Sequence, residues 1–189
     1  MSKDSEINYW NNFYNSFSLE IPSNFCVFIM NYFKNYNSMK ILDAGCGNGR
    51  DTYALSTKHY VTGIDISFKP NDKENCTFII DDFCSYNKDN FDLIYSRFTF
   101  HSIDNNQQEI FIQSIKPNTI LCIETRSDKG NNDYRYYGDN HYRNLTNKIY
   151  LENLLLTNNF TILFSEENIN FSIYKDENPI CIRIICKKI

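Results

Sequence analysis

Five short apolar runs, separated by segments of helical character, constrain the fold of this chain more than any other feature. The runs cover residues 40–43, 60–65, 77–80, 91–96 and 119–124. Helix-like segments follow the first run at 48–59, the fourth at 104–115 and the fifth at 147–158. Strands that alternate with helices pair in parallel, so we predict a parallel α/β sheet with helices on both faces. The link at 66–75 is too short and polar to predict a full helix.

Both ends of the chain depart from this alternation. Near the N-terminus, aromatic residues at three- and four-residue spacings predict a helix over residues 6–17 and a second over 25–33, which begins after Ser23. Near the C-terminus, residues 160–165 and 179–187 resemble strands with no helix between them, which predicts antiparallel pairing. We therefore expect a single domain with two N-terminal helices and a seven-stranded, mostly parallel sheet whose last strand is antiparallel.

Composition narrows the class of protein. The 189 residues fit one domain, and 42% of them are apolar, which is enough for a core. A net charge of -4 argues against a binder of nucleic-acid polymers, which needs a broad basic surface. No apolar run approaches the roughly 20 residues of a membrane span, so we expect a cytoplasmic protein that binds no membrane. The 7 cysteines include no CxxC pair and predict reduced thiols rather than disulfides or a metal site.

A glycine-rich loop directly follows the first predicted strand, in the stretch KILDAGCGNGRDT at residues 40–52. Ligands of parallel sheets bind at the carboxyl ends of the strands, and small residues there let the backbone approach a ligand beside a helix N-terminus. The loop has Arg50 where a dinucleotide fingerprint needs glycine, and it lacks the lysine of a P-loop. The pattern therefore favours a nucleotide-type ligand that is not held by its phosphates.

An acid followed by G-x-G-x-G, as in residues 43–49, resembles the first motif of the class I S-adenosylmethionine-dependent methyltransferases. Three later features agree with it in order: Asp65 ends the second strand in VTGID, Asp82 and Phe83 follow the third, and residues 91–103, FDLIYSRFTFHSI, resemble the fourth-strand motif. The resemblance implies a Rossmann-like fold, S-adenosyl-L-methionine as cofactor and S-adenosyl-L-homocysteine as product.

The same resemblance implies which residues hold the cofactor. Asp65 would accept hydrogen bonds from the ribose hydroxyls, and either Asp81 or Asp82 would meet the adenine amino group. The full implied set is Tyr9, Tyr14, Asp43, Gly45, Cys46, Gly47, Asn48, Asp65, Ile66, Asp82, Phe83, Ser96 and Arg97. For the tyrosines, simple packing of an amphipathic helix is the alternative. Within one methyltransferase domain of residues 1–189, we expect N-terminal helices that cap the cofactor (1–37), a cofactor-binding core (38–125), a substrate loop (126–146) and a C-terminal helix with strands (147–189).

Arginine carries the information about the acceptor. Five of the six arginines follow the predicted ends of strands, at positions 50, 97, 126, 135 and 143. Arginine binds carboxylate and phosphate bidentately, so this grouping in an acidic chain favours a small anionic acceptor. The alternative is that Arg97 and Arg126 pair with carboxylates of the protein or the cofactor. The [DN]-P-P-[YF] motif of enzymes that methylate amino groups of DNA bases and glutamine is absent after the fourth strand, where SRFT stands.

The candidate catalytic residues are His101, His141, Arg126 and Arg143. Either histidine could take the proton of an alcohol acceptor near neutral pH. A phosphate-like oxyanion would need no base, and arginines would orient it.

Several stretches resemble a narrower group of small bacterial methyltransferases found with capsule and surface-glycan genes: NYWNNFY, IPSNF, GCGNGRDT, IYSRFTFHSI, ETRSD and HYRNL. This resemblance implies O-methylation of a phosphate- or phosphoramidate-like precursor of a capsular polysaccharide, free or nucleotide-activated. Methylation of a neutral metabolite, and a noncatalytic partner that binds the cofactor beside an active homologue, are the alternatives. The sequence leaves open whether the protein forms a homo-oligomer or pairs with a partner methyltransferase.

Overall fold

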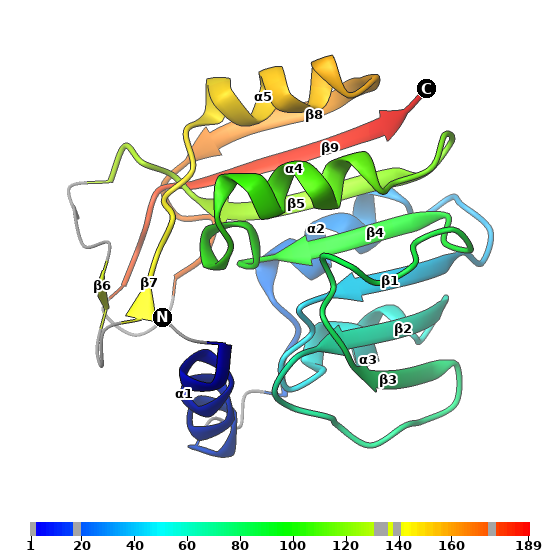
Figure 1. Ribbon diagram of the computed structural model, residues 1–189. Coiled ribbons are helices and arrows are strands. Elements are labelled where there is room, and N and C mark those ends of the chain that lie inside the picture. The colour runs from blue at the N-terminus through cyan, green and yellow to red at the C-terminus, as the bar shows by residue number, and fades with distance from the viewer. Residues whose placement is uncertain (1–2, 17–19, 131–135, 138–140, 174–176) are drawn as a thin grey trace.

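A seven-stranded sheet forms the centre of the molecule, with strand order β3-β2-β1-β4-β5-β9-β8 (Figure 1). The computed structural model describes residues 3–16, 20–130, 136–137, 141–173 and 177–189. The strands are β1 (Lys40–Ala44), β2 (Tyr60–Asp65), β3 (Cys76–Ile80), β4 (Leu93–Arg97), β5 (Ile120–Arg126), β8 (Phe160–Asn168) and β9 (Cys181–Lys188). The first five pair in parallel, whereas β9 is antiparallel to both β5 and β8. The predicted sheet, with its antiparallel last strand, is confirmed.

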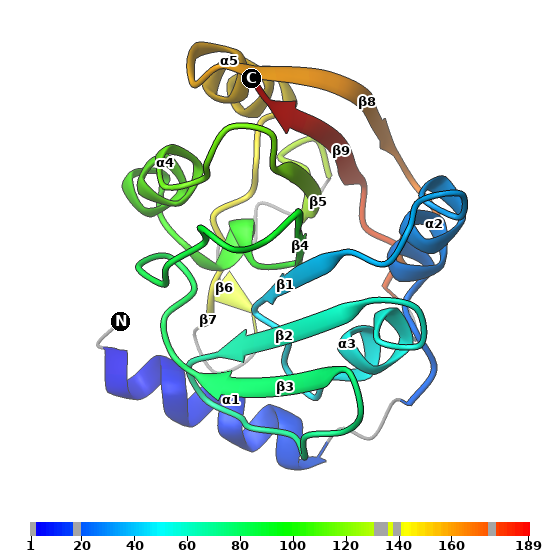
Figure 2. The same ribbon diagram turned by 90° about the vertical axis from the view of Figure 1, so that its right-hand side faces the viewer.

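Helices cover both faces of this sheet, as the sequence predicts. Figure 2 shows α4 (Asn105–Gln113) and α5 (Lys148–Thr157) on one face, and α2 (Asn24–Tyr32) and α3 (Arg50–Leu55) on the other. The side chain of Ser23 caps α2, and Asp104 forms a capping box with Gln107 at the start of α4.

Two of the connections show how local chemistry sets helix length. The structure has no helix between β2 and β3, which agrees with the prediction for the link at 66–75. Helix α3 spans only 6 residues, whereas the sequence pattern predicts residues 48–59. It begins after Gly49, which is left-handed, and ends where Lys58 and His59 donate backbone hydrogen bonds to Leu55 before the chain enters β2.

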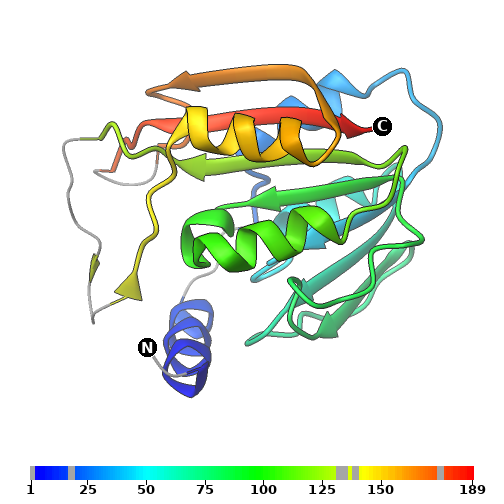
Figure 3. The same ribbon diagram turned by 45° about the horizontal axis from the view of Figure 1, so that its top comes forward.

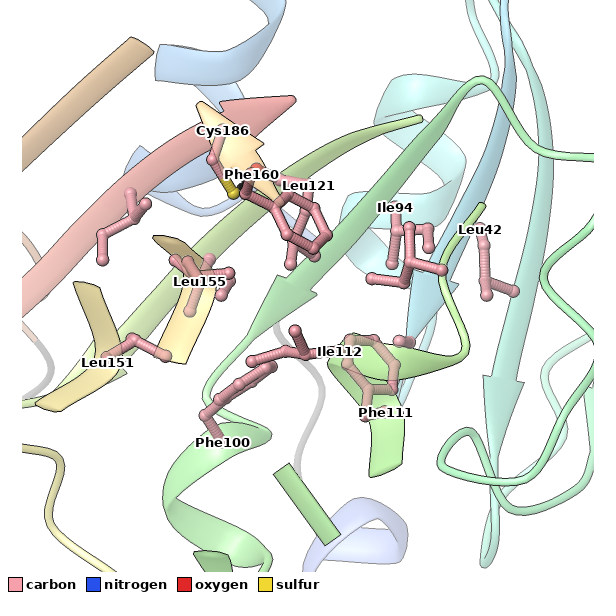
Figure 4. Packing of buried hydrophobic residues seen from close by; sticks show 14 of the residues in the cluster. Leu42, Ile94, Phe100, Phe111, Ile112, Leu121, Leu151, Leu155, Phe160 and Cys186 are labelled. Atoms are coloured by element: carbon pink, nitrogen blue, oxygen red, sulfur yellow. Dashed lines mark hydrogen bonds between the residues drawn. The ribbon is translucent and has the colours of Figure 1, made fainter. Parts of the chain in front are cut away.

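The core has two layers because successive residues of a strand point to opposite faces. Toward α4 and α5, Leu42, Ile94 and Leu121 pack against Phe111 and other residues of these helices (Figure 4). The second layer, toward α2 and α3, consists of Phe25, Cys26, Ile29, Phe33, Met39, Ile41, Leu55, Val61, Leu93, Tyr95, Ile120, Cys122 and Ile185. Each large apolar side chain that is fully buried contributes roughly 1.5–3 kcal/mol, so the central strands are fixed from both sides.

The carboxyl ends of strands β1 to β5 all lie on the same side of the molecule. Near them lie α1 (Lys3–Ser16) and a short hairpin of β6 (Tyr136–Tyr137) and β7 (His141–Tyr142) (Figures 1 and 3). The sequence predicts a loop where this hairpin stands. Residues 131–135 and 138–140 of that predicted substrate loop lie outside the described residues. Within the described part of the chain, no helix has the length and apolarity needed to cross a membrane.

Candidate functional site

The glycine-rich loop after β1 is held in a conformation that only glycine adopts easily. Gly45 has φ 77° and Gly47 has φ 53°, both in the left-handed region. A Cβ at Gly45 would lie 2.1 Å from Cγ2 of Thr99, because the segment after β4 packs directly on the loop. The backbone N–H groups of Gly45 and Cys46 both donate to the carbonyl of Ile64 at the end of β2. The loop is therefore fixed between the ends of β2 and β4.

Helix α1 brings Tyr14 onto this loop. A Cβ at Gly47 would lie 2.4 Å from the hydroxyl of Tyr14, whose ring stacks on Trp10. Burial, and next the carboxylate of Asp65, hold the pKa of Tyr14 well above its usual value, so the phenol stays neutral. Tyr9, by contrast, packs edge-on against Trp10. Tyr14, one of the two predicted capping tyrosines, thus reaches the glycine loop.

Asp65 places a carboxylate beside the loop at the end of β2. Its Oδ2 accepts a hydrogen bond from the N–H of Gly47 at 3.0 Å, and its Oδ1 accepts from both the N–H and the hydroxyl of Ser67. Half-buried Ile66 continues this turn after β2. In the glycine loop itself, Oδ1 of Asn48 accepts a hydrogen bond from the N–H of Arg50 at 3.5 Å. The acid predicted to hold the ribose therefore lies against the loop predicted to hold the cofactor.

Asp43 lies beneath the loop and is almost completely buried. Its Oδ2 accepts a hydrogen bond of 2.6 Å from the hydroxyl of Thr52 in α3. Burial raises the pKa of Asp43 to about 8, although the hydrogen bond from Thr52 favours the charged form. Asp43 therefore titrates near neutral pH, directly under the predicted cofactor loop.

The turn after β3 also meets the glycine loop. The N–H of Asp81 donates to the carbonyl of Asp65, and Cε1 of Phe83 lies 3.8 Å from the Cβ position of Gly45. Both candidate adenine acids bind backbone groups of their own turn: Oδ1 of Asp81 accepts from the N–H of Asp82, and Oδ1 of Asp82 accepts from Cys84. These bonds leave the choice between the two acids as a prediction.

The end of β4 carries a network of polar and charged side chains. The buried hydroxyl of Ser96 is hydrogen-bonded to that of Thr99. The Nε of Arg97 donates to Oε1 of Glu124 at 3.0 Å, and the Nε of Arg183 donates to Oε2 of the same carboxylate at 2.7 Å. The structure therefore gives Arg97 an internal ion pair, which is the alternative to binding the cofactor or an acceptor.

Sequence reasoning missed Glu124 and Arg183. Their signal is the register of three adjacent strands, in which Arg97 of β4 pairs with Glu124 of β5, and Glu124 pairs with Arg183 of β9. That row becomes visible only when the strand order is known.

Phe98 is the centre of a second cluster, and the sequence did not single it out. Its backbone has φ 60°, a strained conformation for an aromatic residue, and such strain is commonly found at functional sites. The guanidinium carbons of Arg97 and Arg126 lie 4.3 Å and 5.5 Å from its ring centroid, and the buried ring of His101 packs edge-on at 5.3 Å. The structure therefore brings together three of the residues predicted to contact cofactor or acceptor.

Arg126 has one buried donor that no described residue satisfies. Its Nη2 forms an ion pair with Glu177, whereas its Nε is buried and has no hydrogen-bond partner among the described residues. Leaving such a donor unpaired costs roughly 1–3 kcal/mol.

Of the remaining predicted residues, Arg143 lies on the segment that leads from β7 to α5. Arg143 is half-buried, and the next residue, Asn144, donates its N–H to the carbonyl of His101 at 2.7 Å. The N–H of Thr146 donates to the carbonyl of Arg126. The end of the predicted substrate loop is thus tied to His101 and Arg126. His141 lies in β7, but its side chain and the whole of Arg135 lie outside the described part of the structure.

Asp51 has a structural role that the sequence did not reveal. It accepts hydrogen bonds from the N–H and hydroxyl of Ser23 and from the hydroxyl of Tyr95, at 2.6–2.7 Å. The Nε of Arg50 lies 3.9 Å from the same carboxylate. Asp51 therefore joins α2, α3 and β4 beneath the glycine loop.

Comparison with known proteins agrees with this arrangement. Residues 21–164 match a family described as a methyltransferase domain. A search of curated protein sequences gave no match. Among solved structures, a SAM-dependent methyltransferase from Anabaena variabilis ATCC 29413 has a TM-score of 0.75 at 21% identity, over 98% of this chain and 94% of the other.

Two further solved structures share the fold. The 1,6-didemethyltoxoflavin-N1-methyltransferase of Burkholderia thailandensis, with bound 1,6-didemethyltoxoflavin and S-adenosylhomocysteine, has a TM-score of 0.68 at 19% identity, over 87% of this chain and 76% of the other. The glycopeptide N-methyltransferase MtfA, complexed with S-adenosyl-L-methionine, has a TM-score of 0.67 at 11% identity, over 89% and 95% of the two chains. At these identities the likeness shows the fold alone.

The seven-stranded fold, together with the family match over residues 21–164, identifies a class I S-adenosylmethionine-dependent methyltransferase. The chain belongs to the methyltransferase-domain family. This membership confirms the expected cofactor, S-adenosylmethionine, with S-adenosylhomocysteine as product. The residues present fit that cofactor. The loop has no side chain at Gly45 or Gly47, so a ligand can approach its backbone, and the carboxylate of Asp65 lies beside it.

Proposed function

We propose that this methyltransferase transfers the methyl group to a small anionic acceptor, namely an oxygen of a phosphate- or phosphoramidate-like group that is free or nucleotide-activated. The observation that carries the proposal is the buried Nε of Arg126, which lacks an acceptor among the described residues. An anionic oxygen would accept this hydrogen bond and remove the cost of the buried donor. Arg97, Phe98 and His101 gather beside Arg126 at the ends of β4 and β5.

The chemistry asks mainly for positioning. S-adenosylmethionine, when bound, supplies an activated methyl group that a nucleophile displaces directly from sulfur. The glycine loop and Asp65 would hold the donor side, and Arg126 would bind and orient an oxyanion. An oxyanion carries no proton on its attacking oxygen, so it needs no general base. An alcohol acceptor would need one, and His101 is the histidine in this cluster.

The biological setting is part of the same proposal. The stretches GCGNGRDT, IYSRFTFHSI, ETRSD and HYRNL resemble small methyltransferases found with capsule and surface-glycan genes. An anionic precursor of a capsular polysaccharide would suit a site that contains arginine. We therefore place the reaction in the modification of such a precursor.

A neutral acceptor is the second candidate, and a specific observation favours it. Glu124 lies between Arg97 and Arg183, and Glu177 pairs with Arg126, so these arginines already have carboxylate partners. A cluster whose charges are balanced can accept a neutral metabolite without burying an unpaired charge.

Two substitutions at one ion pair separate the candidates. Arg126→Lys keeps the charge but removes the Nε donor, and should raise KM for an anionic acceptor about tenfold while the affinity for S-adenosylmethionine stays unchanged. Glu177→Gln removes the internal competitor for Arg126 and should lower the same KM. The measurement is release of S-adenosylhomocysteine with phosphorylated, nucleotide-activated and neutral acceptors.

The outcome of this assay decides between the acceptor classes. If only neutral alcohols or amines react, and neither substitution changes their KM, the anionic acceptor is wrong. A protein that binds S-adenosylhomocysteine but turns over no acceptor of any class would instead be a noncatalytic partner of an active homologue.

A further inference from the structure

Lys88, in the segment between β3 and β4, is 1% exposed, although lysine side chains normally extend their ammonium group into water. A buried charge is costly and persists only where its contacts compensate for the lost water. No step of the proposed reaction uses this lysine, so its burial needs another explanation.

The contacts of the ammonium group supply one. Its Nζ donates hydrogen bonds of 3.0 Å to the carbonyl of Cys84 and to that of Tyr86, which closes the turn after β3 around the charge. From the other side, α4 presents the ring of Phe111, whose centroid lies 4.8 Å from Nζ. The titratable groups that act on the ammonium are the thiol of Cys84 and the carboxylate of Asp82, both in its own segment. Lys88 thus links this turn to α4 in the interior of the protein.

The turn that Lys88 holds faces the glycine loop. Cys84, whose carbonyl binds Lys88, donates its N–H to Oδ1 of Asp82 at 3.0 Å. Phe111, on which the ammonium lies, packs edge-on against Phe83 with 5.7 Å between ring centroids. The edge of Phe83 in turn reaches the Cβ position of Gly45, 3.8 Å away. A short series of contacts therefore leads from Lys88 through Phe111 and Phe83 to the loop after β1.

We propose that Lys88 is a positioning residue for the adenosine half of the cofactor, because it fixes the turn that carries Asp82 and Phe83. Nucleosides bind at the carboxyl ends of strands in sheets of this kind, and Asp82 and Phe83 lie in the turn that follows β3. An adenine base needs an aromatic or apolar surface and a polar group that are held in a fixed position relative to each other. Lys88 contacts Cys84, which binds the polar Asp82, and Phe111, which packs on the aromatic Phe83. The inference rests on the use of S-adenosylmethionine and is independent of the acceptor.

The test is Lys88→Met, which keeps an unbranched apolar side chain of nearly the same length and removes the ammonium. Calorimetry with S-adenosylhomocysteine and with 5′-methylthioadenosine should show affinities at least about tenfold weaker, by a similar factor for both, because the two ligands share the adenosine half. Lys188→Met is the matched control. Lys188 also lies over a ring, that of Phe160, and its Nζ is 3.4 Å from the carbonyl of Ile112. It belongs to β9, four strands away from β2 and five from β3, so both affinities should stay unchanged.

A folded Lys88→Met protein, judged by its unfolding midpoint without ligand, that binds both ligands as tightly as the wild type would overturn the proposal. If that variant fails to fold, hydrogen exchange of the wild-type protein decides. Added S-adenosylhomocysteine should slow exchange at the amides of residues 82–86 as well as at those of residues 45–47, and protection of the glycine loop alone would contradict the inference. Absence of binding by the wild type would contradict the cofactor assignment itself, which separates the two failures.

Discussion

Gly45→Ala is the substitution for which the structure makes the most quantitative prediction. Gly45 has φ 77°, and an added Cβ would lie 2.1 Å from Cγ2 and 3.4 Å from Cβ of Thr99. Thr99 cannot move away freely, because it is buried and its hydroxyl is hydrogen-bonded to Ser96. The new methyl group must therefore displace the segment after β4 or the loop itself.

The expected cost has two parts. An alanine in the left-handed region costs about 1–2 kcal/mol relative to glycine. Overpacking against Thr99 adds about 1–3 kcal/mol. The sum, about 2–5 kcal/mol, should lower the unfolding midpoint by roughly 4–20 °C in a domain of this size, at about 2–4 °C per kcal/mol.

Thermal and urea unfolding should be measured beside two companion variants. Gly130→Ala is the control, since an added Cβ there meets no atom of the described residues within 4 Å, and it should leave stability nearly unchanged. Thr99→Ser removes Cγ2 but keeps the hydroxyl, so Gly45→Ala should cost about 1–3 kcal/mol less in that background. If Gly45→Ala costs no more than Gly130→Ala, or if Thr99→Ser restores nothing, the steric reasoning is refuted.

Three further predictions concern buried acids. Burial raises the pKa of Asp43 to about 8 from the ordinary value of 3.8, so between these pH values the folded protein keeps a proton that the unfolded chain has released. The free energy of unfolding should therefore fall as pH rises from about 4 to 8. Asp43→Asn should flatten this pH dependence in urea unfolding. Glu124→Gln removes the carboxylate that Arg97 and Arg183 share and should lower the free energy of unfolding by about 3–5 kcal/mol. Glu167→Gln, whose partner Lys129 is exposed, should lower it by only about 0–1 kcal/mol, and equal losses would contradict the buried network. Asp65→Ala should weaken S-adenosylhomocysteine binding at least about tenfold, and an unchanged calorimetric affinity would disprove its placement at the ribose.

The sequence predicts the fold well because its signals are local. Alternation of apolar runs with helical segments places the five parallel strands and the helices between them. Ser23 and Asp104 are helix caps whose side chains accept a hydrogen bond from the backbone N–H three residues later, and such a local interaction can be predicted from sequence. The glycine loop is equally local, since its left-handed residues must be glycine wherever the chain goes next.

The acceptor side of the site is less predictable because its contacts are distant in sequence. Arginines at strand ends suggest an anion site, but the partner of Arg97 is Glu124 and that of Arg126 is Glu177, 27 and 51 residues away. Which carboxylate meets which guanidinium depends on strand order and register. For the same reason, Asp51 reads as the end of a motif and only the structure shows that it joins α2 to β4.

The position of β9 between β5 and β8 also governs how the molecule can assemble. β8 pairs only with β9, so it cannot join the sheet until β9 has paired with β5. Until then β5 presents an open edge, rich in isoleucine and leucine, to any other chain. Pairing of strands that lie so far apart in sequence is a slow kind of step, and an uncovered edge of β5 would favour aggregation until it is complete. Expression at low temperature, or chaperones that shield the edge of β5, should therefore improve the yield of folded protein.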